Sequence, residues 1–353
     1  MTIAPSPAKV LVTGASGFIA IWVVRTLLEQ GYSVRGAVRS ASKGKYLQDY
    51  FGERGFGHDK LEIVVVDDMT KVRRAFDEAV KGVDAIEHVA SPVALEAVDP
   101  QDFIKPAVEG TLSILRSALK NGSSLKRIVI TSSGAAIMVQ PTEPRLFSEE
   151  DWNTASVEDV KMNGKNANPT SGYRASKTLA ERAAWDFFAE NKSKTNWDLV
   201  VLNPPVVVGP PIHEVSGGPT NLNASEKWLY DVLVNSSSQS KELLYKSSCW
   251  VDVRDMALAH VLALQKEAAC GERIVLTVET DTFIPSVDVA RTLKPYPLPN
   301  HSPPEGMPGQ EKKYLIHFKT EKQEQILGMT KATLRSMETM VRDTLQEFAR
   351  RGW

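Results

Sequence analysis

The chain has 353 residues, enough for one large or two moderate domains with a sizeable core. Lysine and arginine number 42 and aspartate and glutamate 43, so the charges balance, and no basic cluster indicates binding to nucleic acid or to a membrane surface. No apolar run has the length of a membrane span, residues 1–9 lack the apolar core of a secretion signal, and the two cysteines form no metal-ligand cluster. We therefore expect a soluble cytoplasmic protein that works without a metal ion.

The strongest motif lies near the N-terminus, where a short apolar run at 10–12 predicts a strand and residues 18–30 predict a helix. The turn between them contains Gly14 and Gly17, with Ala20 as a third small residue. Such glycines permit a tight turn and a close approach of the backbone to a pyrophosphate, which the helix N-terminus attracts. Many turns of this kind bind nothing, so the prediction of a cofactor rests on the strand–turn–helix context.

Strand and helix patterns alternate through the first 200 residues, as expected for a parallel sheet covered on both faces. Further strands are predicted at 33–38, 61–66, 85–90, 127–131 and 198–202, and helices at 72–80, 103–119 and 172–190. The segments 203–223 and 295–308 are rich in proline, glycine or polar residues and predict loops. Residues 250–278 predict a strand, a helix and a strand that return to the sheet, and Thr330 is the expected N-cap of a C-terminal helix.

These patterns predict an α/β fold, with a Rossmann-type doubly wound parallel sheet and a smaller, discontinuous C-terminal part. Residues 1–203 would form the dinucleotide-binding domain together with the return segment 250–278. Residues 204–249 and 279–353 would form the substrate-binding part.

The end of the second predicted strand bears on the choice between NAD and NADP. Enzymes that use NAD usually carry an acid there, about 20 residues after the glycines, to bind the ribose 2′-hydroxyl. Here Val38 holds this place, and Arg39 follows it with Lys43 nearby. Because a guanidinium pairs with a 2′-phosphate, we expect NADP(H) as the cofactor. In the alternative interpretation, Arg39 and Lys43 are ordinary solvated charges of a loop.

Two further groups of polar residues allow both a functional and a structural interpretation. Asp68, which precedes Met69 at the end of the third predicted strand, can accept a hydrogen bond from the adenine amino group. Alternatively, Asp67 or Asp68 caps the next helix, and the two roles are compatible. The histidines at 88, 213 and 260 have no partner at metal-ligand spacing, so we expect them to be packing or loop residues.

Two clusters predict an acid–base site. Tyr173 and Lys177 lie four residues apart, hence on one face of a helix, where an ammonium group would stabilise a phenolate. Residues 131–133 are Thr-Ser-Ser at the carboxyl end of the fifth predicted strand, where ligands of open α/β sheets bind and a hydroxyl can donate to a carbonyl oxygen. Alone, the first cluster would be a surface coincidence and the second a turn that satisfies its own backbone. Their occurrence with the glycine turn and Arg39 in one chain favours a catalytic site.

The order of these motifs resembles the extended short-chain dehydrogenase/reductase family over essentially the whole chain. The turn TGASGFIA is similar to the family's TGxxGxx(G/A) motif and GYRASK to its YxxxK site, and HVASPV, NPPVVVGP and WVDVRDMALAH resemble further family segments. The most similar branch contains dihydroflavonol reductases, cinnamoyl-CoA reductases and fungal methylglyoxal or aldehyde reductases.

The resemblance implies a role for each matching position. It makes Ser133, Tyr173 and Lys177 the catalytic triad, with the last two also at the cofactor. The other implied cofactor residues are Gly14, Gly17, Phe18 and Ile19 at the pyrophosphate, Arg39 and Lys43 at the 2′-phosphate, Asp68 and Met69 at adenine, Ala90 at the dinucleotide bridge, and Pro204, Val206 and Val207 at the nicotinamide end. Many extended members carry an Asn where this chain has Ala107, so any proton relay there would run through water.

The leading hypothesis is an NADPH-dependent reductase that converts small aldehydes or ketones to alcohols, as a monomer or a homodimer. The substrate pocket is expected between the end of the fifth strand and the segment after residue 202. Its expected apolar lining, which could equally be plain core, is Pro92, Val93, Ala135, Val206, Val207 and Trp228. Lys227 is the only lysine or arginine in 203–234, too little positive charge for the diphosphate of a UDP-sugar. The alternatives are a sugar-nucleotide epimerase or dehydratase and a non-catalytic NADP-sensing protein.

Overall fold

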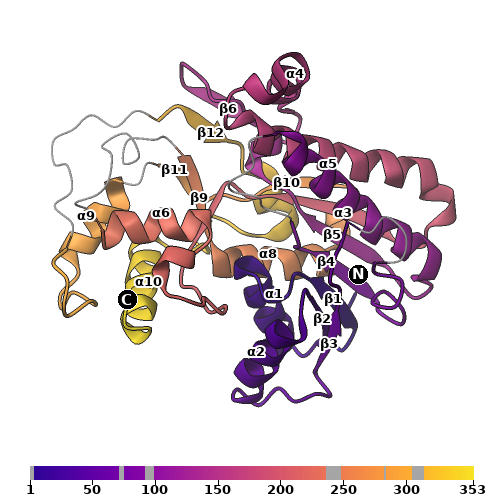
Figure 1. Cartoon of the computed structure of the whole chain (residues 1–353), viewed down its shortest axis with the longest axis horizontal. Helices are drawn as coiled ribbons and strands as arrows, with labels where there is room; N and C mark the ends of the chain where they lie inside the picture. Colours follow the sequence, from indigo (N-terminus) through magenta and orange to yellow (C-terminus); the bar gives the residue numbers. More distant parts are fainter. Residues whose placement is uncertain (1–3, 71–74, 92–98, 236–247, 282–283, 304–313) are drawn as a thin grey trace.

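The computed structural model describes residues 4–70, 75–91, 99–235, 248–281, 284–303 and 314–353, and a large parallel sheet lies at its centre (Figure 1). Seven strands form this sheet in the order β10-β7-β5-β4-β1-β2-β3, with every neighbouring pair parallel. The strands are β1 (Lys9–Thr13), β2 (Ser33–Val38), β3 (Leu61–Val65), β4 (Ala85–His88), β5 (Arg127–Thr131), β7 (Asp198–Asn203) and β10 (Arg273–Val275). From β1 the chain winds first toward β3 and then, through β4, toward β10, so the predicted doubly wound fold is confirmed.

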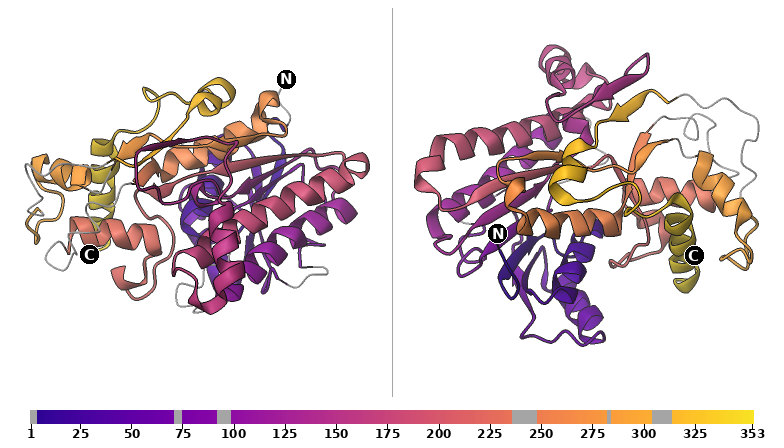
Figure 2. Two further views of the ribbon diagram at one scale, coloured as in Figure 1. Left: turned by 90° about the horizontal axis from the view of Figure 1, so that it is seen from above. Right: turned by 180° about the vertical axis from the view of Figure 1, so that it is seen from behind.

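Helices cover both faces of this sheet (Figure 2). The helices α1 (Phe18–Glu29), α2 (Ala41–Gly52) and α8 (Val253–Gln265) pack on one face, and α3 (Gln101–Asn121) and α5 (Ser171–Asn191) on the other. Successive strand residues alternate between the two layers: Val10 and Val12 join the cluster of α1 and α8, and Leu11 joins that of α3 and α5. Because both faces are buried, the central positions of the strands are mostly apolar, and most polar residues stand at the strand ends.

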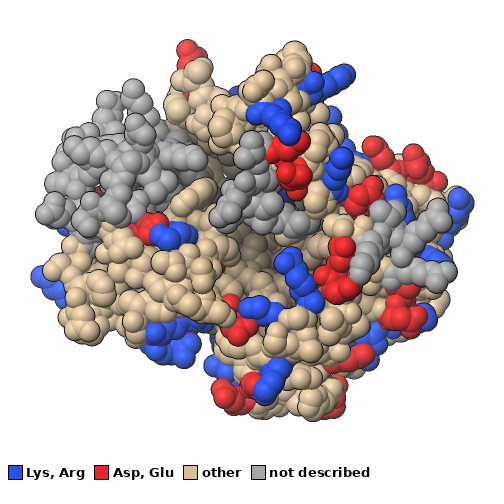
Figure 3. Space-filling view, viewed as in Figure 1, with Lys and Arg blue, Asp and Glu red and all other residues tan. Residues whose placement is uncertain are grey.

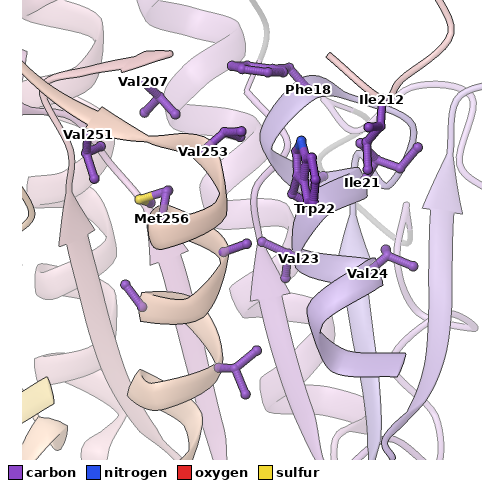
Figure 4. Packing of buried hydrophobic residues seen from close by; sticks show 14 of the residues in the cluster. Phe18, Ile21, Trp22, Val23, Val24, Val207, Ile212, Val251, Val253 and Met256 are labelled. Atoms are coloured by element: carbon purple, nitrogen blue, oxygen red, sulfur yellow. The ribbon is translucent and has the colours of Figure 1, made fainter. Parts of the chain in front are cut away.

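The layer of α1 and α8 also holds the smaller part of the protein in place. Figure 4 shows Trp22 and Val23 of α1 in one cluster with Met256 of α8 and Ile212 of the loop after β8 (Val206–Val208). The indole Nε1 of Trp22 donates to the carbonyl oxygen of Pro210 at 2.9 Å. The loop that follows β8 is therefore fixed to the helix that follows the glycine turn.

The remaining elements form two small sheets and a group of helices. β8, β9 (Ser248–Asp252) and β11 (Glu279–Asp281) make a three-stranded sheet, and β6 (Arg145–Phe147) pairs with β12 (Ile316–Phe318). The helices are α4 (Thr154–Asn163), α6 (Ala224–Leu233), α9 (Ile284–Thr292) and α10 (Met337–Arg350). In Figure 1, α6, α9 and α10 lie together at one side of the large sheet, where Tyr230 of α6 packs against Phe348 of α10 with ring centroids 5.1 Å apart.

Four sequence predictions differ from the structure. The predicted helix at 72–80 is wrong for its described residues, since 75–82 form turns although Phe76 and Val80 are buried as expected. The loop predicted at 203–223 contains β8, whose three valines pair with β9. The strand predicted at 250–253 therefore belongs to this small sheet as part of β9, and of the segment 250–278 only β10 returns to the large sheet. Thr330 does not cap the C-terminal helix; Ser336 does, by accepting a hydrogen bond from the backbone N–H of Thr339. For the helix predicted at 72–80 and the N-cap predicted at Thr330, the spacing of apolar residues indicates which positions are buried. The same spacing can continue across turns that interrupt a helix, so it does not mark where the helix begins.

Candidate active site

The turn between β1 and α1 lies against the end of β4. Gly14 has φ +63°, and a Cβ there would stand 3.0 Å from the Cα of Ala90, so this position requires glycine. The backbone N–H of Ala90 donates to Thr13 Oγ1 at 3.1 Å, and Thr13 Oγ1 lies 2.9 Å from His88 Nδ1. The structure thus brings together Gly14 and Ala90, two predicted cofactor residues from strands far apart in the sequence.

His88 supports this turn as a neutral imidazole. Burial, with the charge of Lys177 as a smaller cause, lowers the pKa of His88 to about 3. Since Thr13 Oγ1 accepts from Ala90, its own hydrogen is free to point at Nδ1 of the neutral ring. His88 is therefore a packing and hydrogen-bonding residue beneath the site.

The N-terminus of α1 fits the pyrophosphate of a dinucleotide. Gly17 is its N-cap; no side chain caps the helix, and its first turn carries no acidic residue. Uncapped N–H groups at a helix N-terminus attract an anion. Of the other predicted pyrophosphate residues, Phe18 is buried against the ring of His213, with centroids 5.7 Å apart, and Ile19 is half-buried.

The end of β2 places basic groups where a 2′-phosphate would lie. The side chain of Arg39 is exposed and has no hydrogen bond or ion pair with any residue that the structure describes. Ser40 caps α2 by accepting from the backbone N–H of Lys43. The Lys43 ammonium donates to Glu214 at 2.8 Å, so one of the two predicted phosphate ligands already has an acidic partner.

Asp68 and Met69 lie where β3 ends. Asp68 Oδ1 accepts from the backbone N–H of Thr70 at 2.8 Å and from its hydroxyl at 2.6 Å, so it stabilises the turn at residues 69–70. Met69 covers Gly110 of α3, where an added Cβ would meet the methionine methyl group at 2.6 Å.

Ser133 follows β5 and caps the short helix η1 (Gly134–Ala136). Its Oγ accepts from the backbone N–H of Ala135 at 3.1 Å. That contact uses a lone pair, and the hydroxyl hydrogen has no acceptor among the described residues. The turn that satisfies its own backbone is therefore present, yet it leaves Ser133 able to donate.

Tyr173 and Lys177 lie on the first turns of α5, the helix that packs against η1. Tyr173 is 36% exposed, and its hydroxyl makes no hydrogen bond within the described ranges of the chain. The Lys177 ammonium lies 5.9 Å from the centroid of the Tyr173 ring and donates to Ser91 Oγ at 2.9 Å. The predicted pair thus faces one side of the helix, and Ser91 after β4 joins it.

The predicted substrate residues are only partly brought together. Val206 and Trp228 pack in one apolar cluster with Val232 and Val287, and Ala135 is half-buried beside Ser133. Pro92 and Val93 lie outside the described residues. Figure 3 shows the molecular surface from the same side as Figure 1. This surface is hollowed near its centre, close to the position of α1 in Figure 1.

The other residues predicted to lie at the nicotinamide end of the cofactor are Pro204 and Val207. They follow β7 of the large sheet, where the chain enters the smaller part of the protein. Pro204 is buried and accepts a hydrogen bond from the backbone N–H of Gly134 at 2.7 Å. Val207 belongs to the cluster of α1 and α8. The segment after β7 is therefore tied directly to the turn that carries Ser133.

Sequence reasoning missed three side chains around the site: Ser91, Glu181 and Asn203. Asn203 Nδ2 donates to the backbone oxygen of Ser133 at 3.3 Å and to Glu181 Oε2 at 2.7 Å. A signal existed for Glu181, since it follows Lys177 at the same spacing of four residues by which Lys177 follows Tyr173. Ser91 and Asn203 lie in the segments HVASPV and NPPVVVGP, which resemble family segments, but no spacing marks either residue individually.

The described ranges contain no group of three or more His, Cys, Asp and Glu side chains that could hold a metal ion. Nor do they contain a helix long and apolar enough to cross a membrane.

Comparison with known proteins agrees with the motifs. The NAD dependent epimerase/dehydratase family matches residues 10–277. Ketoreductase azaE of Aspergillus niger is 34% identical over 342 residues, which cover 96% of each chain. The putative NADPH-dependent methylglyoxal reductase GRP2 of Candida albicans is 35% identical over 335 residues, covering 92% of this chain and 94% of the other.

Solved structures agree as well. The yeast methylglyoxal/isovaleraldehyde reductase Gre2 complexed with NADPH aligns with a TM-score of 0.84 and 29% identity, over 98% of this chain and 99% of the other. The predicted resemblance to fungal NADPH-dependent reductases is thereby confirmed. From the matched residues, the glycine turn and the Tyr173–Lys177 helix, we conclude that the chain belongs to the NAD-dependent epimerase/dehydratase family, within the extended short-chain dehydrogenases/reductases.

Proposed function

We propose that the protein is an NADPH-dependent reductase that converts small, largely uncharged aldehydes and ketones to alcohols. The observation that carries the proposal is that Ser133 and Tyr173, from two elements in contact, both have a hydroxyl hydrogen without an acceptor in the described chain. Two free donors at the carboxyl end of a parallel sheet suit a carbonyl oxygen. The fungal reductases named above support the same reaction class.

In the proposed mechanism, Tyr173 donates its hydroxyl proton to the substrate oxygen as that oxygen gains charge. Ser133 donates a hydrogen bond to the same oxygen and stabilises the charge. Lys177, held by Ser91, stabilises the tyrosinate that remains. NADPH, when bound, supplies the hydride. Ala107 has no polar side chain, so the proton would return to Tyr173 from water.

The proposed cofactor site extends along the carboxyl end of the sheet. The uncapped α1 N-terminus with Gly14, Gly17, Phe18 and Ile19 would hold the pyrophosphate. Arg39 and Lys43 would bind the 2′-phosphate, which supports NADPH over NADH. Asp68 and Met69 would contact adenine, Ala90 the bridge, and Pro204, Val206 and Val207 the nicotinamide end.

The substrate class is tested by NADPH oxidation against methylglyoxal, aromatic aldehydes, ketoesters, flavanonols and UDP-sugars. We expect turnover of at least one uncharged aldehyde or ketone and none of UDP-sugars. Turnover of UDP-sugars would favour the epimerase or dehydratase alternative. NADPH binding with no turnover of any carbonyl compound would favour the sensor. The oligomeric state, monomer or homodimer, stays a prediction for a sedimentation measurement.

A further inference from the structure

One carboxylate next to the proposed site has no access to solvent and no role in the mechanism above. Glu181 lies on α5, one turn beyond Lys177, and its side chain is 0% exposed. A buried charge without function would be costly, because desolvation of an ion is seldom recovered in full. Its two oxygens therefore need hydrogen-bond donors within the protein.

Glu181 receives hydrogen bonds from three strands of the large sheet. Its Oε2 accepts from Ser132 Oγ at 2.5 Å, just after β5, and from Asn203 Nδ2 at 2.7 Å, at the end of β7. Its Oε1 accepts from Arg273 Nε at 2.5 Å, at the start of β10. An ionised carboxylate only accepts hydrogen bonds, so these converging donors suit it in number and kind.

The same hydrogen bonds restrain the chain at Ser133. Ser132, its neighbour in the chain, is held by Glu181 directly. Asn203, held by the same oxygen, donates to the backbone carbonyl of Ser133 at 3.3 Å. The side chain of the residue before Ser133 and, through Asn203, the carbonyl group of Ser133 itself are thus fixed to one carboxylate.

Helix α5 makes this anchoring relevant to the reaction. It carries Tyr173, the proposed proton donor, and also Glu181, which fixes the backbone of Ser133. In the proposed mechanism the hydroxyls of Ser133 and Tyr173 donate to the same carbonyl oxygen of the substrate. The distance between these two hydroxyls therefore depends on Glu181. A misplacement of about 1 Å in such a pair can lower a rate about 100-fold.

We propose that Glu181 is a positioning residue, which holds Ser133 at the correct distance from Tyr173 through Ser132 and Asn203. Arg273 supplies its counter-charge and is itself fixed by the carbonyl oxygens of Glu149 and Asp151, the latter at 3.1 Å. The inference rests on the proposed function, because it gives Glu181 a task only if Ser133 acts on the substrate.

A second ion pair in the same sheet, between a buried arginine and a partly buried aspartate, provides a matched control. Arg127 and Asp198, the first residues of β5 and β7, form a bidentate ion pair with N–O distances of 2.6 and 2.8 Å. This pair joins two of the strands that Glu181 joins, but at their amino ends, away from Ser133. Its loss should affect stability alone.

The experiment compares Glu181→Gln with Asp198→Asn by thermal unfolding, NADPH binding and steady-state kinetics on the best carbonyl substrate of the panel. Both variants should unfold at a lower temperature, because each leaves a buried guanidinium unpaired. Only Glu181→Gln should lower kcat, by about 10- to 100-fold, with the Kd for NADPH unchanged. If Glu181→Gln does not fold, Glu181→Gln/Arg273→Met removes the unpaired charge and is expected to regain stability without regaining kcat.

A double-mutant cycle with Ser133→Ala shows whether Glu181 acts through Ser133. We expect Glu181→Gln to lower kcat in the wild-type background and hardly at all in the Ser133→Ala background. An equal fall in both backgrounds, or no fall in either, would overturn the positioning role. If Ser133→Ala alone keeps the wild-type kcat, the proposed role of Ser133 is wrong and the positioning role fails with it. If Ser133→Ala loses turnover and Glu181→Gln does not, the positioning role alone is wrong.

Discussion

Several polar side chains at the two ends of the large parallel sheet differ in whether they find hydrogen-bond partners within the protein. At the amino end, Arg127 is 0% exposed and its guanidinium is bound on every side: to Asp198, and to the carbonyl oxygens of Ala263 and Lys266 at 2.7 and 2.6 Å. At the carboxyl end, the hydroxyls of Ser133 and Tyr173 and the guanidinium of Arg39 have donors with no acceptor in the described part of the chain.

The difference shows where the fold leaves room for a ligand. A polar group that only supports the fold should find a partner within the protein, since an unpaired buried donor is costly. Beneath the open groups of the carboxyl end lies a layer that is paired in this way: Thr13 with His88, and Ser132 with Glu181. The unpaired groups in front of this layer are the ones we assign to cofactor and substrate.

The largest expected effect tests the carboxyl end. Tyr173→Phe should lower kcat by about 10²–10⁴-fold, because the proton donor is lost while the ring remains. The melting temperature should not change, since the hydroxyl has no partner among the described residues. Tyr50→Phe on α2, whose ring lies under Arg54, is a control that should keep full activity. A Tyr173→Phe protein with a near-normal rate would exclude this residue as the essential donor.

The next effect tests the amino end. Arg127→Met should lower the free energy of unfolding by about 3–5 kcal/mol, because the partly buried carboxylate of Asp198 loses the guanidinium that pairs with it. The folded enzyme should keep its kcat, which kinetics below the melting transition would measure. Adding Asp198→Leu should recover most of the stability. A selective loss of kcat in Arg127→Met would contradict the separation of the two ends.

Arg39→Ala should weaken NADPH binding by about 1.5–3 kcal/mol, or roughly 10- to 100-fold, since a charge-assisted contact to the phosphate is lost. NADH binding should stay the same, and so should stability, because Arg39 has no partner within the described ranges. Fluorescence titration with both cofactors measures this, with Lys45→Ala on α2 as the control for a lost positive charge. Equal losses for NADPH and NADH would argue against a 2′-phosphate site here.

A fall in pH should lower the free energy of unfolding through His88, which lies in the layer of paired side chains beneath the carboxyl end of the sheet. The pKa of His88 is about 3 in the folded protein because of burial, and near 6.5 in an unfolded chain. As pH falls below about 6.5, the unfolded state takes up this proton first, so the contribution to stability is full above that pH and is lost toward pH 3. The wild type should lose about 2 kcal/mol through His88 between pH 7 and 5, and His88→Asn should be spared that loss. Denaturant unfolding at the two pH values measures the difference, and equal losses would refute the assignment.

The smallest effect concerns the one predicted phosphate ligand that is already paired. Glu214→Gln removes the acid that holds Lys43, whose side chain is 39% exposed. An ion pair this exposed contributes less than about 1 kcal/mol, so NADPH should bind up to about fivefold more tightly and NADH as before. Weaker NADPH binding in this variant would show that Glu214 orients Lys43 and does not compete for it.

Features that depend on near neighbours along the chain could be predicted from the amino-acid sequence. The glycine turn, the alternation of strands and helices, the pair of Tyr173 and Lys177 and the basic residue after β2 are all set by spacings of a few residues. Such spacings fix which side chains share a helix face or follow a strand, and the resemblance to a family of reductases came from their order.

Contacts between residues far apart in the chain could not be predicted in this way and became known from the three-dimensional structure. Lys177 contacts Ser91, 86 residues away in the chain, and Lys43 contacts Glu214, 171 residues away. Glu181 joins three strands whose order in the sheet no local pattern records. The reason is physical: local periodicity specifies the burial of a position, whereas a hydrogen bond between strands depends on how the whole chain crosses the sheet. The same reason explains why Phe76 and Val80 are buried as predicted although residues 75–82 form turns.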